Sequence, residues 1–424
     1  MKPIKLFPII ILAIALGCQP ALPTNTNTLS ASTSHISTAT PLRTPTKTST
    51  STATPNPLFH SQCPEMVTGI PDSLELEGKI ILEGNTENSG LFFFDPTNNT
   101  LTRIPDYGAW SYSATSPNGK YIAYQLYGDN DKRYLAIADA DNNILKSMPW
   151  QESWYEVLSW VNDEQLTIAN SDENSPHGEE KRIVVVSPFK DKLEYINPHG
   201  LGYPDYNSVH EPWVEYDPTL ERAVYFSWNQ HILLNTQTKE ILATLSGSGL
   251  GYLDLDWSQD GEFVAIAGYA PELSQYSGHA DELYVISRDG KINLTHLTDF
   301  FGAGVKDYSS YGLSIEHPSW SLDGRFIAFW ESDNLNKNGE WDRDWRLAIL
   351  DVKTMEITSY CSRSKILGVS TTPIWSPNSQ QIVIMGHNYT ILKNDPIFMI
   401  DIPNNIAVEI AQNAVPVGWM VSNP

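Results

Sequence analysis

The sequence predicts an all-β protein that folds as a single seven-bladed β-propeller. Three observations support this prediction. A segment made of an aromatic residue, a tight turn and an apolar strand recurs along the chain; a further pair of strands follows it; and each end of the chain holds part of one blade. Internal repetition at periods of tens of residues is typical of propellers and solenoids.

The first repeated unit passes from an aromatic residue through a turn into an apolar strand. In the clearest copies the turn is Asn-Gly at 118–119 or Asp-Gly at 260–261 and 323–324, and these pairs accept the positive φ angle of a two-residue hairpin turn. The six copies cover residues 115–124, 160–168, 216–226, 257–266, 320–329 and 375–384. Each copy predicts the first two strands of a blade.

The second repeated unit is an apolar strand, a turn and another strand. Clear examples lie at 135–146, 232–245 and 347–360. Four strands per unit, at spacings of about 41 to 63 residues, is the organisation of a propeller blade. Unrelated hairpins in a β-sandwich are the alternative.

The two chain ends complete the count of blades. Residues 79–83, 91–95 and 101–104 supply three strands of a blade that lacks its first strand, whereas 415–421 supply a first strand with no successor. We therefore expect the C-terminal strand to complete the N-terminal blade, which would close the ring and remove exposed sheet edges. Six whole blades and one shared blade make seven.

The repeats resemble those of TolB-type β-propellers. The resemblance rests on Trp-Ser-x-Asp-Gly-x-Phe-x-Ala at 257–265, Trp-Ser-x-Asp-Gly-x-Phe-Ile-Ala at 320–328 and Trp-Ser-Pro-Asn at 375–378, and it extends over about residues 79–421. Blades three and four depart from the pattern. The resemblance implies the fold and no single function, because such blades occur in periplasmic interaction proteins, prolyl-peptidase relatives and some polysaccharide lyases.

Residues 1–18 are typical of a lipoprotein signal peptide. Lys2 and Lys5 precede an uncharged stretch at 6–17, which is too short to span a bilayer but suits a signal-peptide core. Ala-Leu-Gly-Cys at 15–18 resembles the bacterial lipobox, which implies cleavage before Cys18 and acylation of its thiol. An ordinary secretory signal with a chance cysteine is the alternative.

A stalk is predicted to follow the signal. Of the 38 residues from 20 to 57, 24 are Ser, Thr or Pro, so the segment cannot bury enough surface to offset its chain entropy. We expect a disordered linker at 19–58, a lead-in segment at 59–78 and the propeller at 79–424. A random coil of this length would reach about 35 Å.

Loop lengths distinguish the two faces of the predicted disc. Turns between strands one and two, and between strands three and four, are short. Connections between strands two and three, and between blades, are long, and they include 170–182, 198–213, 269–281, 298–318, 332–344 and 387–395. Because long loops on a rigid scaffold usually carry binding residues, we predict that this long-loop face binds the partner.

A candidate ligand site lies where the innermost strands meet the long-loop face. Counting back three residues from each repeat aromatic leads to one tier of side chains that could converge on a ligand, and loop aromatics could add to the contact surface. The candidates are Tyr112, Trp213, Asp254, His317, Trp341 and Trp345. The alternatives are a hydrated channel without function and, for each aromatic, packing between blades.

One loop resembles the calcium loops of some propeller blades. Its alternating side-chain oxygens, turn glycine and later carboxylate come from Asn334, Asn336, Asn338, Gly339 and Asp342. Calcium needs six to eight oxygens, and Asn in the first position removes a charge. An ordinary Asn- and Gly-rich turn is the alternative, and no other cofactor is expected.

Two cysteines remain after Cys18. Cys63 precedes the first strand of the propeller, and Cys361 follows the last strand of the sixth blade. In an exported protein the two could form a disulfide that pins the incoming chain to the ring, contributing about 4 to 5 kcal/mol in the chain-entropy model. Two free thiols are the alternative.

The charge balance favours a basic or cation-bridged partner. The formal net charge is −23, and all 50 acidic residues lie after residue 58. Such a surface is a poor match to the phosphate backbone of nucleic acid and to anionic glycans.

No enzyme motif stands out in the chain. The sequence lacks a Gly-x-Ser-x-Gly elbow, a His-Glu-x-x-His pair, a phosphate-binding glycine loop and a Cys-x-x-Cys pair. We therefore expect a monomeric, lipid-anchored, extracytoplasmic module that binds or scaffolds a protein or cell-envelope component without catalysis. The alternative is a polysaccharide-degrading lyase with a metal site in the channel that uses His317.

Overall fold

The computed structural model describes one part of the chain. The chain divides into two units, Met1–Thr54 and Pro55–Pro424. The described residues run from 59 to 421, with gaps at 75, 85–89, 106–112, 130–131, 152–153, 173–179, 197–212, 228–229, 247–253, 270–280, 296, 298–312, 334–344, 361–370 and 387–394. Within these ranges no helix is long and apolar enough to cross a membrane. The predictions on Cys18 and on the linker lie outside the described residues.

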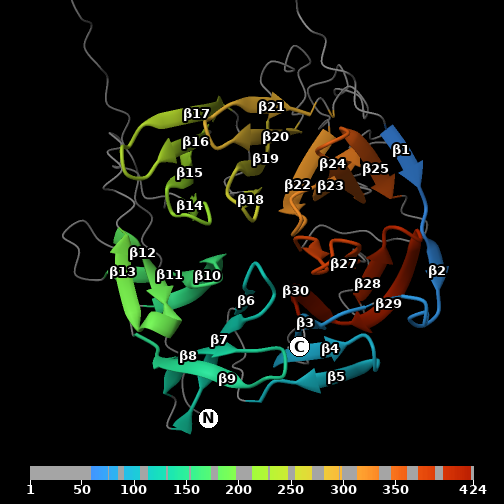
Figure 1. Cartoon of the computed structure of the whole chain (residues 1–424), viewed down its shortest axis with the longest axis horizontal. Coiled ribbons are helices and arrows are strands. Elements are labelled where there is room, and N and C mark those ends of the chain that lie inside the picture. Colours follow the sequence, from blue (N-terminus) through green and yellow to red (C-terminus); the bar gives the residue numbers. More distant parts are fainter. Residues whose placement is uncertain are drawn as a thin grey trace, which may run out of the picture. The chain divides into compact units, whose positions relative to one another are not determined.

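Seven β-sheets follow one another round a ring, as Figure 1 shows, so the predicted seven-bladed propeller is confirmed. In blades 2 to 7 the four main strands run from the inside to the outside of the ring in chain order. Blade 2 contains β6 (Ser113–Thr115), β7 (Ile122–Tyr127), β8 (Arg133–Ala138) and β9 (Ile144–Pro149). Blade 3 contains β10 (Trp154–Asn162), β11 (Gln165–Asp172), β12 (Glu180–Ser187) and β13 (Lys192–Ile196), with the short 3-10 helix η2 (Pro188–Lys190) before β13.

The remaining blades repeat the pattern. Blade 4 contains β14 (Trp213–Tyr216), β15 (Arg222–Ser227), β16 (Gln230–Asn235) and β17 (Ile241–Ser246). Blade 5 contains β18 (Leu255–Trp257), β19 (Phe263–Tyr269), β20 (Asp281–Ser287) and β21 (Ile292–Leu294). Blade 6 contains β22 (Leu313–Trp320), β23 (Phe326–Asp333), β24 (Arg346–Asp351) and β25 (Glu356–Tyr360). Blade 7 contains β26 (Ile374–Trp375), β27 (Gln381–Met385), β28 (Pro396–Asp401) and β29 (Ile406–Gln412).

Blade 1 closes the ring with strands from both ends of the chain. The C-terminal β30 (Ala414–Met420) pairs antiparallel with β3 (Lys79–Gly84), and β4 (Gly90–Asp95) and β5 (Thr100–Arg103) complete the sheet. The indole N–H of Trp419 also donates to the carbonyl of Glu77, at 2.8 Å. The predicted closure by the C-terminal strand is therefore confirmed.

The lead-in segment contributes two strands that the sequence did not predict. β1 (Phe59–Gln62) pairs parallel with β25, and β2 (Glu65–Val67) pairs parallel with β29, so blades 6 and 7 have five strands each. Between them, the amide of Asn405 donates to the carbonyl of Cys63 at 3.1 Å, and Cys63 is disulfide-bonded. We call residues 59–78 the strap.

The hydrophobic core lies between neighbouring blades. Each apolar cluster draws on adjacent sheets; for example, one joins Trp330 and Trp345 of blade 6 to Trp375 and Ile382 of blade 7. The repeat Trp also makes a polar contact across the interface, since the indole N–H of Trp375 donates to the carbonyl of Ser319, at 3.0 Å. The repeat aromatic is therefore an inter-blade residue.

The first turn of blades 2, 4, 5, 6 and 7 contains a residue in the left-handed region. The glycine of the Asn-Gly or Asp-Gly pair has a φ of 69° at Gly119, 70° at Gly261 and 68° at Gly324. Where glycine is missing, Leu220 and Ser379 adopt the same region, with φ values of 62° and 58°. The turn geometry is thus kept even where the residue type is unfavourable.

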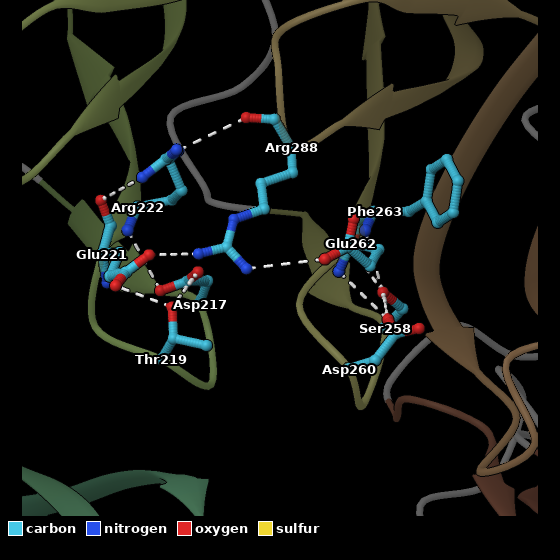
Figure 2. A network of polar contacts seen from close by, with 9 residues as sticks. All are labelled: Asp217, Thr219, Glu221, Arg222, Ser258, Asp260, Glu262, Phe263 and Arg288. Carbon is cyan, nitrogen blue, oxygen red and sulfur yellow. Dashed lines mark hydrogen bonds and ion pairs between the residues drawn. The ribbon is translucent and has the colours of Figure 1, made fainter.

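The short-turn side of blades 4 and 5 is held together by a polar network (Figure 2). The guanidinium of Arg288, which follows β20, pairs with Glu221 of blade 4 and approaches Glu262 of blade 5 at 3.5 Å. In return, the Nε of Arg222 donates to the carbonyl of Arg288 at 3.3 Å. These groups satisfy one another across the interface, which gives this face a structural role.

Candidate binding site on the inner strands of blades 4 to 6

Two predicted site residues come together on the inner strands. Asp254 directly precedes β18, and His317 lies within β22 of the next blade. The backbone N–H of His317 donates to Oδ1 of Asp254 at 2.8 Å, and Nδ1 of the imidazole lies 3.4 Å from the same oxygen. The side chains of His317 and Asp254 remain 34% and 22% exposed. The structure therefore places this pair where both groups can reach solvent.

A β-bulge in β22 makes the contact possible. The register of β22 against β23 shifts between Glu316 and Ser319, and His317 has a φ of 53° within this irregular stretch. A left-handed conformation is costly for a residue with a Cβ, and strained residues cluster at functional sites. The bulge turns the N–H of His317 away from its own sheet and toward blade 5.

A second carboxylate of blade 5 accepts a hydrogen bond from β22 just after the bulge. The backbone N–H of Trp320 donates to Oδ2 of Asp256 at 2.6 Å. Asp254 directly precedes β18 and Asp256 lies within it, two residues further on, so extended backbone directs both side chains to the same side. Two carboxylates of blade 5 thus accept charge-assisted hydrogen bonds from the inner strand of blade 6.

Glu215 of blade 4 adds a third carboxylate. It lies on β14, is partly accessible to solvent, and interacts electrostatically with Asp256 and Asp254. Desolvation by the surrounding protein, followed by repulsion from Asp256 and Asp254, raises the pKa of Glu215 to about 8. We call Glu215, Asp254, Asp256 and His317 the inner acidic cluster.

Desolvation also sets the protonation of the other members. It raises the pKa of Asp256 to about 7, against the lowering effect of the Trp320 and Trp257 N–H groups. It raises the pKa of Asp254 to about 6, against the N–H of His317. Desolvation lowers the pKa of His317, which Glu316 partly offsets. The cluster therefore changes its charge near neutral pH, as groups at functional sites often do.

Two of the four residues of this cluster, Asp254 and His317, were predicted from the sequence. They lie three residues before a repeat aromatic, Trp257 and Trp320. Asp256 and Glu215 stand one residue before Trp257 and Tyr216. Because side chains two apart on a strand share a face, extending the tier by one strand period would have found both.

Other predicted site residues are not brought into the cluster. Tyr112 and Trp341 lie outside the described residues. Trp213 begins β14, and the structure does not describe its side chain. Trp345 corrects a prediction: its side chain is 1% exposed and packs in the core between blades 6 and 7 rather than on a contact surface.

The predicted calcium loop cannot be compared with the structure. Asn334, Asn336, Asn338 and Asp342 all lie outside the described residues. At the base of this connection, the carboxylate of Glu331 is fully buried and accepts hydrogen bonds from Arg346 at 2.9 Å and from Ser359 at 2.9 Å. In the part of the chain that the structure describes, no three His, Cys, Asp or Glu side chains are grouped so that they could hold a metal ion.

Comparison with known proteins finds similar solved structures and no relative in sequence. No family model matches the chain, and no curated protein matches it in sequence. TolB from Acinetobacter baumannii is similar in structure, with 13% identity over 82% of this chain and 68% of that chain and a TM-score of 0.41. A periplasmic gluconolactonase from Pseudomonas aeruginosa is also similar, with 15% identity over 82% of this chain and 99% of that chain and a TM-score of 0.48.

The strand order confirms the seven-bladed propeller expected from the repeats. TolB structures are among those to which the chain is similar. At these identities and TM-scores the likeness carries no argument about function. The functional argument therefore rests on the residues of this chain.

Proposed function

We propose that this chain is a lipid-anchored, extracytoplasmic propeller that binds a basic group of a protein or cell-envelope partner without catalysis. The observation that carries the proposal is the inner acidic cluster, in which Asp254 contacts His317 of the next blade and the carboxylates of Asp254 and Asp256 interact electrostatically with Glu215 of the preceding blade. A primary ammonium offers three N–H donors and a guanidinium five, so such groups suit several carboxylates at once.

The cluster lies toward the predicted binding face. The chain enters β18 after the connection at 247–253 and leaves it through the short turn that ends at Phe263. Asp254 is therefore at the end of the inner strand from which the long connections depart. Every described hairpin turn on the opposite side is short, and in blades 4 and 5 that side is occupied by the Arg288 network.

The charge of the whole chain supports the same class of partner. With a formal net charge of −23, the chain attracts cations over a distance comparable to the Debye length. Complementary charge of this kind speeds association and selects partners more than it sets final affinity. We therefore expect binding to weaken as salt is raised.

The test is binding of a defined basic probe to the purified propeller. Fluorescence anisotropy with labelled oligolysine, against oligoglutamate, measures the dissociation constant at pH 8. We expect Asp254→Asn to weaken oligolysine binding about tenfold, because the site loses a partly buried charge. Glu240→Gln removes one charge from an exposed turn outside the cluster and should change binding less than twofold. Equal effects of the two variants would contradict the proposed site.

One observation favours a second function. An imidazole held by a carboxylate, as His317 is by Asp254, is also how many enzymes orient a general base. This pair supports the alternative of a polysaccharide-degrading enzyme. Product formation from acidic or neutral polysaccharides that requires a divalent ion and disappears in His317→Ala would favour the enzyme over the binding module.

A further inference from the structure

We propose that Arg288 is a positioning residue for the inner acidic cluster, because its guanidinium bridges blades 4 and 5 and so sets the separation of the inner strands that carry Glu215 and Asp256. The bridge itself is a property of the propeller without ligand. In its effect on a partner, this inference rests on the proposed function, since the same carboxylates would bind the basic group.

Acidic residues occupy equivalent positions in blades 4 and 5. Glu215 and Asp256 each directly precede the repeat aromatic, and Glu221 and Glu262 each follow it five residues later. The residue before each of the other copies of the repeat is uncharged: Ala114, Ser159, Ser319 and Ile374. Ionised carboxylates in neighbouring blades repel one another, so a cation placed between them stabilises this interface.

The inner strand of blade 4 packs its apolar side chains against blade 3. Val214 and Tyr216 of β14 belong to the cluster that contains Ile183 of blade 3. The apolar cluster between blades 4 and 5 instead takes its described blade 4 members from β15, β16 and β17. Because side chains alternate along a strand, Glu215 is directed away from blade 3 and toward blade 5. The separation of β14 from β18 therefore depends on polar contacts.

Arg288 ties the two inner strands together through the turns that follow them (Figure 2). Its guanidinium pairs with Glu221 of blade 4 and lies 3.5 Å from Glu262 of blade 5. Its backbone N–H donates to the carbonyl of Glu262 at 2.8 Å, and its carbonyl accepts from Nε of Arg222 at 3.3 Å. The side chain of Arg288 is 27% exposed, so salt screens these contacts less than those of a fully exposed pair.

The turn that carries Arg288 is itself fixed against blade 4. A Cβ on Gly290, whose φ is 84°, would lie 2.3 Å from the carbonyl oxygen of Leu242 on β17, so the two backbones are in direct contact. In blades 4, 6 and 7 the equivalent backbone N–H bond is made by Thr236, Val352 and Ile402. Of these four turns, the one beside the pair of acids is thus the one that holds a cation at this position.

The titration of Glu215 tests the positioning role. Glutamate labelled at its carboxyl carbon lets NMR follow each carboxyl with pH, and the signal lost in Glu215→Gln identifies the residue. Desolvation, Asp256 and Asp254 raise the pKa of Glu215 to about 8, and His317 faces Asp254 from β22. In Arg288→Gln we expect this pKa to fall by about one pH unit, because a wider gap admits water and weakens the repulsion. Loss of a positive charge alone acts in the opposite direction, so a fall reports altered geometry.

Two further variants serve as controls. Lys120→Gln removes one positive charge from an exposed turn of blade 2 and should leave the pKa of Glu215 unchanged. Arg288→Lys keeps a cation but not the forked guanidinium, and we expect an intermediate pKa; this variant decides the question if Arg288→Gln does not fold. If Arg288 only stabilised the fold, its loss would lower the free energy of unfolding without changing this titration. An unchanged or raised pKa of Glu215 would overturn the inference.

Binding of oligolysine near pH 9, where Glu215 is largely ionised with either pKa, separates the inference from the proposed function. If the pKa falls and Arg288→Gln binds about threefold more weakly than Lys120→Gln, which has the same net charge, both stand. If the pKa falls but the natural protein does not bind, the positioning role stands and the proposed function fails. If the natural protein binds and the pKa does not fall, the positioning role fails and the proposed function stands.

Discussion

Glu215 shows how a single residue ties the stability of the propeller to pH. In the unfolded chain its pKa is the ordinary 4.5, whereas in the folded protein desolvation and the charges of Asp256 and Asp254 raise the pKa to about 8. A raised pKa means that the folded state binds more protons than the unfolded state between these two values. Its contribution to stability is therefore fully present below about pH 4.5 and is lost as the pH rises through 8.

The corresponding prediction concerns urea unfolding between pH 5 and pH 8. We expect the free energy of unfolding to decrease with pH, and Glu215→Gln to reduce that slope by up to about 1.4 kcal/mol per pH unit, which is the linkage of one proton. The exposed Glu240→Gln should keep the natural slope. An unchanged slope in Glu215→Gln would show that the side chain ionises normally in the folded protein.

At lower pH, carboxyl groups with lowered pKa values make the folded protein less stable as the pH falls. The carboxyl of Asp351 experiences desolvation, but the hydrogen bonds from Arg325 and from the backbone N–H groups of Lys353 and Thr354 outweigh it and lower its pKa. Stability from this group is present above its unfolded pKa of about 3.8 and is lost as the pH falls below it. The two kinds of carboxyl together predict greatest stability in mildly acidic solution.

The strap shows what one added element does to the ring. β1 and β2 cover the outer strands of blades 6 and 7, which would otherwise be open edges, and Leu74 packs between blades 1 and 7. Parallel pairing matches Gln62 with Tyr360 at the last described position of both strands. In the sequence, Cys63 directly follows Gln62, and Cys361 directly follows Tyr360.

We therefore predict that the disulfide of Cys63 joins it to Cys361, the pairing that the sequence suggested. Peptide mapping of the unreduced protein should yield one cross-linked peptide that contains both residues. Cys63→Ser should lower the free energy of unfolding by up to about 4 to 5 kcal/mol, because the unfolded chain loses a long closed loop. The double variant Cys63→Ser with Cys361→Ser should be no less stable than the single one. Two alkylatable thiols in the unreduced protein would contradict the pairing.

In the propeller, the strap pairs with the outermost strands of the closed ring before the chain forms blade 1. The strap joins blade 6 first and blade 7 next, and only then does the chain begin blade 1. If Cys18 is acylated, a force transmitted from the membrane along the chain acts first on β1 and its pairing with blade 6. It acts only afterwards on β3 and β30, which close the ring. The strap and its disulfide would protect the closure from such a pull.

The anchor is tested in the intact chain. We expect Cys18→Ser to move the protein from the membrane fraction to the soluble fraction and to abolish incorporation of labelled fatty acid, because acyl chains supply about 0.8 kcal/mol per buried methylene. Urea unfolding of the variant should match that of the natural protein. A variant that stays in the membrane fraction after high-salt washing would contradict lipid anchoring through this residue.

The sequence by itself determined the architecture, because a propeller is a local repeat. Each repeat contains its own signals within a few dozen residues: a turn pair such as Asp260-Gly261, alternating strand residues and an aromatic residue. The shared blade is predicted because the N-terminal strands lack a first strand and the C-terminal strand lacks the strands that should follow it. Trp345 was wrongly predicted to lie on the contact surface. The sequence around an aromatic residue next to a loop is the same whether its side chain faces solvent or packs between two blades. Only the structure shows that it is buried.

The tertiary structure alone decided which polar groups meet. Glu215 and Asp256 are unremarkable in the sequence, and they gain raised pKa values only because blades 4, 5 and 6 bring them beside one another and desolvate them. The strap was missed for the same reason, since β1 and β2 are too short and too exposed to be strands without the edges that they cover. Local pattern determines a repeated fold, whereas electrostatic sites and added edge strands depend on contacts between residues far apart in the chain.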